Sequence, residues 1–221
     1  MHFYAPTPHF NDTIDSLKNE FKDDNSDTIV VCGVHETSKT KMVADFKKRY
    51  SKVIAFNQEP LFAKQRQFMH PLMYKFIKDA DEVWDYDELN FRMIKTIRPD
   101  TELHILKPYK DWSKYAPVEK DIDILFYGAM NDYRRNILNL FKRNYKVTIL
   151  NQFDNLDSYI LRAKILLNIH YFYEVQMQEQ ARIIRWIGAP CQILSEHSWR
   201  NYLNVPELPE VFTPRHISKL V

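Results

Sequence analysis

The polar residues best suited to chemistry follow apolar runs that have the composition of buried strands. Gly128 comes directly after the run 122–127, and Arg134 and Arg135 stand at the head of the next helical segment. The chain has only three glycines, so few turns can use one. In α/β proteins a strand-to-helix turn is where phosphates meet backbone N–H groups and the positive end of a helix. Gly128 and the arginines therefore predict a diphosphate site; the alternative is a turn glycine beside solvated arginines.

A second group of polar residues follows in the same half of the chain. His170 and Tyr171 come after the apolar run 165–169. Glu179 and Arg182 are spaced i,i+3, which places them on one face of a helix. A carboxylate there can accept both hydroxyls of a ribose while the arginine binds phosphate. The alternative is a solvated ion pair on a surface helix.

The first half offers side chains that could accept a proton. They follow two β-branched runs, 28–32 and 52–56, where the carboxyl ends of parallel strands would meet. A histidine or carboxylate at such an edge can deprotonate an acceptor hydroxyl, although each is also a common cap or turn residue. The candidate catalytic bases are His35, Glu36 and Glu59, and Asn57 is the neighbouring candidate for binding the acceptor.

A cluster of basic residues lies close to these two runs in the sequence. A charge run of this kind is commonly a solvated helix face. If it binds a ligand, it suits a polyanionic acceptor such as duplex DNA. Its members are Lys39, Lys41, Lys47, Lys48, Arg49 and Lys52.

Composition excludes several classes of protein. Of 221 residues, 45% are hydrophobic, and 31 basic residues face 29 acidic ones, which fits a folded protein without a strongly charged surface. The sequence lacks the glycine-rich loops of phosphate-loop NTPases and dinucleotide-binding proteins and the nucleophile elbow of hydrolases. Cys32 and Cys191 predict buried thiols, and no His or Cys spacing predicts a zinc site. No secretory signal or membrane-spanning run is recognisable, so we expect a soluble, cytoplasmic protein without a membrane partner.

Strand-like and helix-like segments alternate, which predicts parallel sheets with helices on both faces. In the first half the predicted strands are 28–32, 52–56, 82–86 and 102–106. The predicted helices are one around Ile14, Leu17 and Phe21 with Asn11 or Asp12 as its cap, then 41–50, 62–78 with Pro71 starting, kinking or splitting it, and 89–97. In the second half the predicted strands are 122–127, 146–150, 165–169 and 191–194, and the predicted helices are 133–143, 156–163 and 176–187.

Two arrays of strands and helices are separated by residues 107–120, which contain two prolines and no clear periodicity. We therefore predict a Rossmann-like domain at 1–108, a linker at 109–120, a second Rossmann-like domain at 121–205 and a C-terminal tail at 206–221. The predicted fold class is α/β, with two small domains that face each other across a cleft holding the ligand.

Five segments of the chain carry a further signal. In order they are NQEPL, DADEVWDYDELN, DILFYGAMNDYRRNIL, AKILLNIHYF and EQARIIRWIGAPCQILSE. They resemble the motifs of two-domain GT-B glycosyltransferases that are common in large DNA viruses, phages and bacteria. The resemblance extends over about residues 52–196. It implies a GT-B-like fold in which 121–205 binds a nucleotide sugar and 1–108 binds the acceptor.

The resemblance also implies roles for donor-side residues. Gly128 and Arg134 or Arg135 would lie at the donor diphosphate, and Glu179 would bind the donor ribose. The remaining donor-side candidates are His170, Tyr171, Arg182 and Glu196.

On the acceptor side, the resemblance implies that Asn57 and Glu59 face the cleft. Pro60 stands where the family often has glutamine, which is a departure in that loop. GT-B enzymes are generally independent of metal at the chemical step, so no metal and no permanently bound cofactor are expected.

The short chain, rich in Lys, Asn and Phe, also resembles small phage enzymes that transfer glucose or arabinose to hydroxymethylcytosine. The resemblance implies a UDP-sugar as donor and a hydroxymethylated cytosine in DNA as acceptor, with the basic cluster on the phosphates. Two alternatives remain. The same chemistry could act on a glycan or a protein, or the chain could be a non-catalytic binding protein with this fold.

Overall fold

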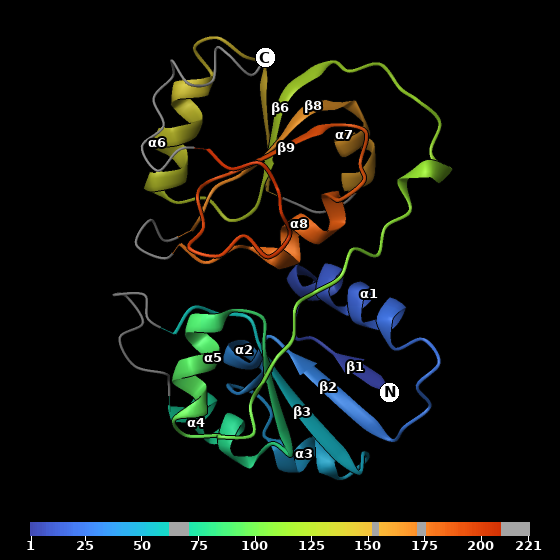
Figure 1. Cartoon of the computed structure of the whole chain (residues 1–221), viewed down its shortest axis with the longest axis vertical. Helices are drawn as coiled ribbons and strands as arrows, with labels where there is room; N and C mark the ends of the chain where they lie inside the picture. The colour runs from blue at the N-terminus through green and yellow to red at the C-terminus, as the bar shows by residue number, and fades with distance from the viewer. Residues whose placement is uncertain (62–70, 152–154, 172–175, 209–221) are drawn as a thin grey trace. The chain divides into compact units, whose positions relative to one another are not determined.

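The computed structural model describes residues 1–61, 71–151, 155–171 and 176–208. The chain divides into two compact units, Met1–Tyr109 and Lys110–Val221. Figure 1 shows that each unit contains its own sheet with helices packed around it.

The first unit is built on a five-stranded sheet in the order β1-β2-β3-β4-β5. All neighbouring strands are parallel, with Thr28 opposite Lys52 and Ile54 opposite Glu82 in the central pairs. The strands are β1 (His2–Tyr4), β2 (Thr28–Cys32), β3 (Lys52–Asn57), β4 (Glu82–Asp85) and β5 (Glu102–Leu103). Every residue of β2 is buried, which is expected of a parallel strand that is covered on both faces.

Helices cover both faces of this first sheet. They are α1 (Asn11–Glu20), α2 (Val34–Thr37), α3 (Val43–Lys47), α4 (Pro71–Asp79) and α5 (Glu88–Lys95). Helices α2 to α5 contribute to one hydrophobic cluster with Val31 and Ala55. On the other face, Phe21 at the end of α1 stacks on Trp84 with ring centroids 5.7 Å apart.

Several predicted boundaries in the first unit are wrong. Strand β1 was not predicted, because three residues followed by prolines show no periodicity. Neither Asn11 nor Asp12 caps α1, since a short 3-10 turn, Pro8–Phe10, leads into the helix and Phe10 holds the cap position. The segment 41–50 is helical only at Val43–Lys47. Helix α4 is described from Pro71 to Asp79. The predicted helical residues 62–70 lie outside the described part of the chain, so the effect of Pro71 on that helix stays a prediction.

The second unit is built on a four-stranded parallel sheet in the order β7-β6-β8-β9. Its strands are β6 (Ile122–Tyr127), β7 (Val147–Leu150), β8 (Ala163–Asn168) and β9 (Gln192–Ser195), and its helices are α6 (Asp132–Phe141), α7 (Leu156–Arg162) and α8 (Gln180–Trp186). One face of the sheet packs on α6 through Phe126 and Leu138. The other face packs on α7 and α8 through Leu125 and Trp186.

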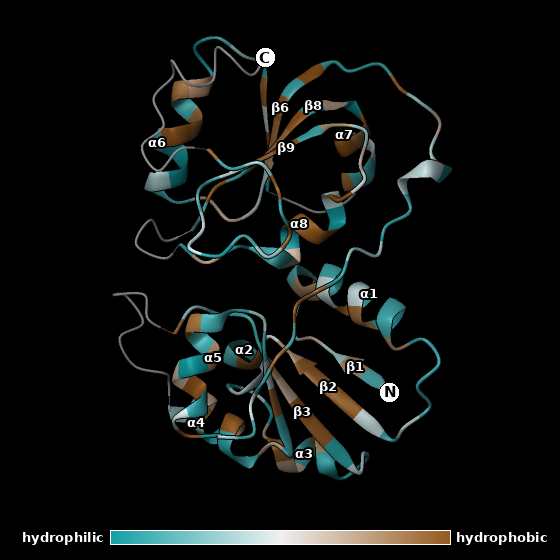
Figure 2. Cartoon of the chain, in the orientation of Figure 1, coloured by the Kyte–Doolittle hydropathy of each residue, from teal (hydrophilic) through white to brown (hydrophobic). Residues whose placement is uncertain are grey.

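Hydrophobic residues in the second unit gather along the strands, whereas α6 carries both hydrophobic and hydrophilic residues (Figure 2). Helix α6 begins at Asp132 because the Asn131 side chain accepts the Arg134 N–H at 2.9 Å. Helix α8 begins only at Gln180, four residues later than predicted. It ends before Gly188, whose φ of +82° lies in the left-handed region that favours glycine.

Both units are therefore α/β, with parallel sheets and helices on both faces, as predicted. This arrangement is compatible with a Rossmann-like fold. Across the described ranges of both units, every helix is too short or too polar to span a membrane.

The turn at Gly33 gives a test of how tightly the first unit is packed. Gly33 adopts φ +61°, and a Cβ there would lie 2.5 Å from the Phe10 ring. We expect Gly33→Ala to lower the free energy of unfolding by about 2 kcal/mol or more, from left-handed strain and displacement of Phe10. Gly188→Ala is the matched control, because φ is +82° but the nearest atom is 3.9 Å away. Its loss should be about 1 kcal/mol. Urea denaturation of both variants gives the comparison, and equal losses would contradict the role of Phe10.

Candidate functional site

The candidate donor site lies at the carboxyl ends of β6 and β8. Gly128 follows β6 and adopts φ +134°, a conformation that disfavours any side chain. A Cβ at this position would lie 2.8 Å from Nη2 of Arg182 and 3.5 Å from Nη1 of Arg134. The backbone conformation therefore favours glycine here, and a Cβ would also require the end of the Arg182 side chain to shift.

Arg134 is the central buried residue of this edge, with 2% of its side chain exposed. Its Nη2 donates to the Glu179 carboxylate at 2.8 Å and to the Ile169 carbonyl at 2.6 Å. Nε also donates to Ile169, at 3.0 Å, and Nη1 donates to the Ala129 carbonyl at 2.7 Å. The guanidinium carbon lies 5.2 Å from the centre of the Tyr171 ring. Arg134 thus joins three segments, and most of its donors are used within the protein.

Arg182 forms an ion pair with the other carboxylate oxygen of Glu179. Its Nη2 lies 2.7 Å from Oε2, and its Nη1 donates to Asn168 Oδ1 at 2.9 Å. Its Nε makes no hydrogen bond within the described ranges. The exposed fractions of the two side chains are 12% for Arg182 and 23% for Glu179. Arg182 therefore retains its Nε donor, whereas four of the five N–H groups of Arg134 are bonded within the protein.

Burial and neighbouring charges have opposite effects on the pKa values of Glu179 and Arg134. Burial alone would raise the pKa of Glu179, but the charges of Arg182 and Arg134 outweigh it, and the pKa is lowered. Burial lowers the pKa of Arg134 to about 10 despite the opposing charge of Glu179. At neutral pH Glu179 and Arg134 are therefore ionised.

A second carboxylate, Glu196, lies beside this group. It accepts the backbone N–H of His170 at 2.6 Å and the hydroxyl of Tyr133. The ring Nε2 of His170 lies 3.0 Å from the His197 carbonyl. Burial raises the pKa of Glu196 above its ordinary value, although His170 and Tyr133 oppose this. Glu196 thus holds the backbone after β8 in place.

The structure shows which of the two neighbouring arginines, Arg134 or Arg135, contacts Glu179, a choice that the sequence left open. Arg135 is exposed and pairs with Asp132 on the same helix, so it does not meet Glu179. Tyr171 joins the group, since its N–H donates to Glu179 at 3.1 Å and 37% of the residue is exposed. Sequence analysis missed Asn131, Tyr133 and Asn168. Asn131 carried a usable signal, because asparagine before a helix is a common cap.

In the first unit, the three candidate bases come together at the carboxyl ends of β2 and β3. Nε2 of His35 lies 3.4 Å from Oε1 of Glu36 and 3.5 Å from Oε1 of Glu59. The side chain of His35 is 14% exposed, and its ring meets Phe10 edge-on at 6.0 Å. Asn57 is the last residue of β3 and is 1% exposed, so its side chain faces the interior.

The basic cluster does not form one surface at this edge. Lys47 pairs with Asp81 at 2.6 Å, and Lys52 pairs with Glu82, at the amino end of β4. Lys48 pairs with Asp45 at 2.9 Å within its own turn of helix. The cations of the cluster without an ion pair to a described residue are Lys39, Lys41 and Arg49, of which Lys41 lies 4.4 Å from the Tyr4 ring centre and Arg49 lies 5.8 Å from that of Tyr50.

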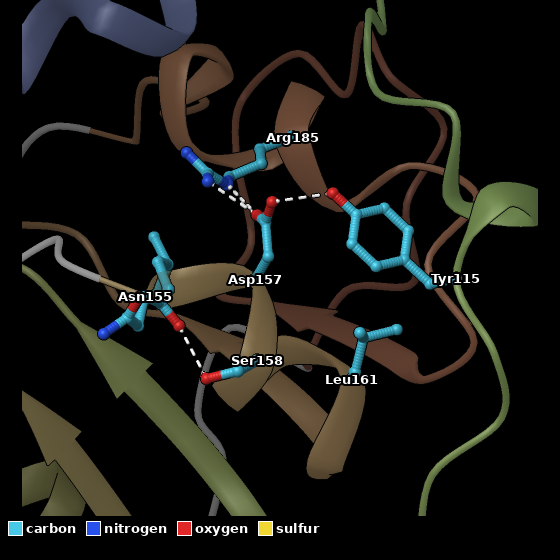
Figure 3. A pocket seen from close by; sticks show the side chains of 7 residues that line it. Tyr115, Asn155, Asp157, Ser158, Leu161 and Arg185 are labelled. Carbon is cyan, nitrogen blue, oxygen red and sulfur yellow. Dashed lines mark hydrogen bonds and ion pairs between the residues drawn. The ribbon is translucent and has the colours of Figure 1, made fainter.

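A separate pocket of about 410 Å³ lies beside α7 and α8 (Figure 3). At its wall Asp157 accepts from Arg185 at 2.6 Å and from the Tyr115 hydroxyl at 3.0 Å. Lys110 also pairs with Asp157. This carboxylate therefore ties residues 110–115 to two helices. In the described ranges, no group of three metal-ligating side chains is arranged to hold an ion.

Comparisons with known proteins find distant viral relatives. The chain matches no family model. It is 27% identical over 165 residues to an uncharacterized protein of Acanthamoeba polyphaga mimivirus, covering 69% of this chain and 18% of that protein. A second uncharacterized mimivirus protein is 28% identical over 137 residues, covering 56% and 18%. A third is 26% identical over 212 residues, covering 86% and 66%. The chain thus spans a small part of the first two relatives and about two thirds of the third.

Arg134 gives a test of the donor edge. Arg134→Ala removes one of the two cations that bind Glu179 and the main donors to the Ile169 and Ala129 carbonyls, so we expect a loss of about 3–5 kcal/mol in the free energy of unfolding. Arg135→Ala, one residue along the same helix, removes an exposed ion pair and should change it by about 0.5 kcal/mol or less. Chemical denaturation measures both. Similar losses in the two variants would contradict the central role of Arg134.

Glu196 gives a test of pH dependence. Its folded-state pKa lies above the ordinary value of 4.5. The folded protein therefore binds this proton more tightly than the unfolded chain does, and the group's contribution to stability falls as pH rises from about 4.5 through the folded-state pKa. Glu196→Gln removes this titration. We expect stability–pH curves of wild type and variant to diverge across that window, with wild type losing more on the alkaline side. Parallel denaturation curves over that range would refute the raised pKa.

Proposed function

We propose that the chain is a glycosyltransferase that moves a sugar from a nucleotide-sugar donor to a hydroxyl acceptor. In this proposal the two units take the roles of the two domains of a GT-B enzyme. The second unit binds the donor, and the first unit binds the acceptor and removes its proton. UDP is the nucleotide we expect.

The observation that supports this proposal most is the partly exposed Glu179–Arg182 pair beside Gly128. A carboxylate with 23% exposure can accept hydroxyls of a ribose. The Arg182 guanidinium lies next to a glycine without a side chain, so a diphosphate can approach both the cation and the backbone. As the sugar–phosphate bond breaks, charge builds on the leaving diphosphate, and a fixed cation stabilises that charge.

The first unit supports the other half of the reaction. His35, Glu36 and Glu59 place an imidazole between two carboxylates at the carboxyl edge of a parallel sheet. Such a group can take a proton from a hydroxyl, provided that the reaction inverts the configuration of the sugar.

For the acceptor, we propose hydroxymethylated cytosine in DNA, with a glycan or protein as the alternative. Lys39 and Lys41 support DNA, since neither makes an ion pair within the described ranges. The ion pairs of Lys47 and Lys48 reduce what the rest of the cluster could add. Binding through phosphates releases counterions, so it must weaken steeply with salt.

The test is release of nucleoside diphosphate from a panel of nucleotide sugars, with and without hydroxymethylcytosine DNA, at two salt concentrations. We expect release from one donor that rises with the modified DNA and falls at high salt. Release that ignores DNA and salt would keep sugar transfer and exclude DNA as the acceptor. Failure to release or bind any nucleotide would overturn the proposal and favour a non-catalytic protein.

A matched pair of variants tests the donor site itself. Arg182→Lys keeps the charge but loses the planar donor group, so nucleoside diphosphate affinity measured by calorimetry should fall about tenfold or more. Arg143→Lys is the control, because Arg143 is exposed and follows the end of α6, whereas Arg134 lies at the start of that helix. Equal affinity in both variants would remove Arg182 from the donor site.

A further inference from the structure

The loop that follows β3 is held by two buried asparagines. Asn57 accepts the Glu59 N–H at 3.3 Å and donates to the Glu59 carbonyl at 3.0 Å. Asn90 donates to the same carbonyl at 2.8 Å and accepts the Leu61 N–H at 3.0 Å. Both asparagines are at most 1% exposed. The backbone of Glu59 is thus hydrogen-bonded to Asn57 at the end of β3 and to Asn90 on α5.

Two buried aspartates hold the asparagines in turn. Asp85 Oδ2 accepts from the Asn57 amide at 2.6 Å, and Asp85 Oδ1 accepts the Asp87 N–H at 2.8 Å. Asp87 caps α5 by accepting the Leu89 N–H at 2.9 Å, which fixes the first turn that carries Asn90. Both aspartates are 0% exposed.

Gln58, the residue before Glu59, makes two further hydrogen bonds that hold the loop. The Tyr86 hydroxyl donates to the Gln58 carbonyl at 2.8 Å, and the Gln58 amide donates to Thr13 on α1 at 2.5 Å. Burying so many polar groups costs desolvation, and the hydrogen bonds among them rigidify one local geometry. Within the described ranges, the Gln58 side-chain oxygen is a buried atom of this group without a hydrogen-bond partner. The part of the loop fixed in this way carries one partly exposed ionisable side chain, that of Glu59.

The Glu59 carboxylate is directed at a defined partner. Its Oε1 lies 3.5 Å from His35 Nε2, and 23% of the side chain is exposed. Glu36 also approaches His35, but it belongs to the four-residue helix α2 and is 33% exposed. Of the two carboxylates, Glu59 has its backbone bonded to buried side chains on both sides, which is what a preoriented proton acceptor requires.

We propose that Asn57 and Asn90 are positioning residues that hold Glu59 beside His35, so that Glu59 takes the proton of the acceptor hydroxyl. This inference rests on the proposed function for its chemical step. The acceptor oxygen forms a bond to the sugar carbon while the bond from that carbon to the leaving diphosphate breaks, with its electron pair remaining on the diphosphate. The hydroxyl proton goes to the Glu59 carboxylate, and His35 orients that carboxylate through Nε2.

The test uses the full chain with Glu59→Gln, Asn90→Ala, both changes together, and Asn19→Ala as the control. Asn19 is exposed on α1 in the same unit. The first readout is titration of the His35 imidazole by NMR, which requires no acceptor and no turnover. A nearby carboxylate favours the imidazolium, so Glu59→Gln should lower the pKa of His35. Asn90→Ala should lower it in part, and the double variant no further than Glu59→Gln alone. Asn19→Ala should leave it unchanged.

The second readout is the turnover rate with the acceptor that the release assay identifies. Glu59→Gln should reduce kcat about 100-fold. Asn90→Ala should reduce kcat about tenfold, with the KM for the donor unchanged and no added effect in the double variant. Circular dichroism monitors folding, and Asn90→Ser replaces Asn90→Ala if the latter does not fold.

The two readouts separate the two ideas. If Asn90→Ala leaves the His35 titration unchanged, or adds fully to Glu59→Gln, the positioning role is wrong whatever the activity. If the titrations are coupled but no acceptor supports transfer, the positioning role stands and the proposed function fails. Coupled titration together with non-additive kcat supports both.

Discussion

The ion pairs that Glu179 makes with Arg134 and Arg182 are the interaction on which the carboxyl ends of β6 and β8 depend. A buried guanidinium is costly unless its donors are satisfied. Arg134 meets that condition by binding a carboxylate and two carbonyls from separate segments. Those bonds fix the turn after β6, the end of β8 and the start of α8 relative to one another. Gly128 suits this turn, because its φ of +134° disfavours a side chain and a Cβ there would displace the end of Arg182.

This arrangement divides the work between two arginines that look alike in sequence. Arg134 uses most of its donors in hydrogen bonds within the protein. Arg182 binds the same carboxylate from α8, and its Nε has no partner in the described ranges. Burial and hydrogen-bond saturation, rather than charge, distinguish Arg134 from Arg182. Glu196 completes the edge as a backbone clamp after β8, with its charge disfavoured by burial.

In the first unit, side-chain amides rather than ion pairs fix the segment that carries the carboxylate. Asn57 and Asn90 grip the Glu59 backbone through neutral hydrogen bonds, and the buried Asp85 and Asp87 fix the asparagines. Amide groups donate and accept at once, so each asparagine bonds both sides of the loop. Both units thus place a partly exposed carboxylate on a rigid support at the carboxyl ends of parallel strands, where ligands of α/β proteins commonly bind.

The sequence by itself determined the alternation of strands and helices. Strand β2 and strand β6 have their predicted bounds because continuous apolar runs bounded by glycine leave few alternatives. It also singled out Glu179 and Arg182, although Glu179 is the residue that precedes α8 and not part of the helix. Only the tertiary structure decided that Arg134 is buried while Arg135 is exposed, that Asn57 faces inward, and that ion pairs with Asp81 and Glu82 occupy Lys47 and Lys52. These outcomes depend on which side chains from distant segments supply partners, and local spacing carries no information about that.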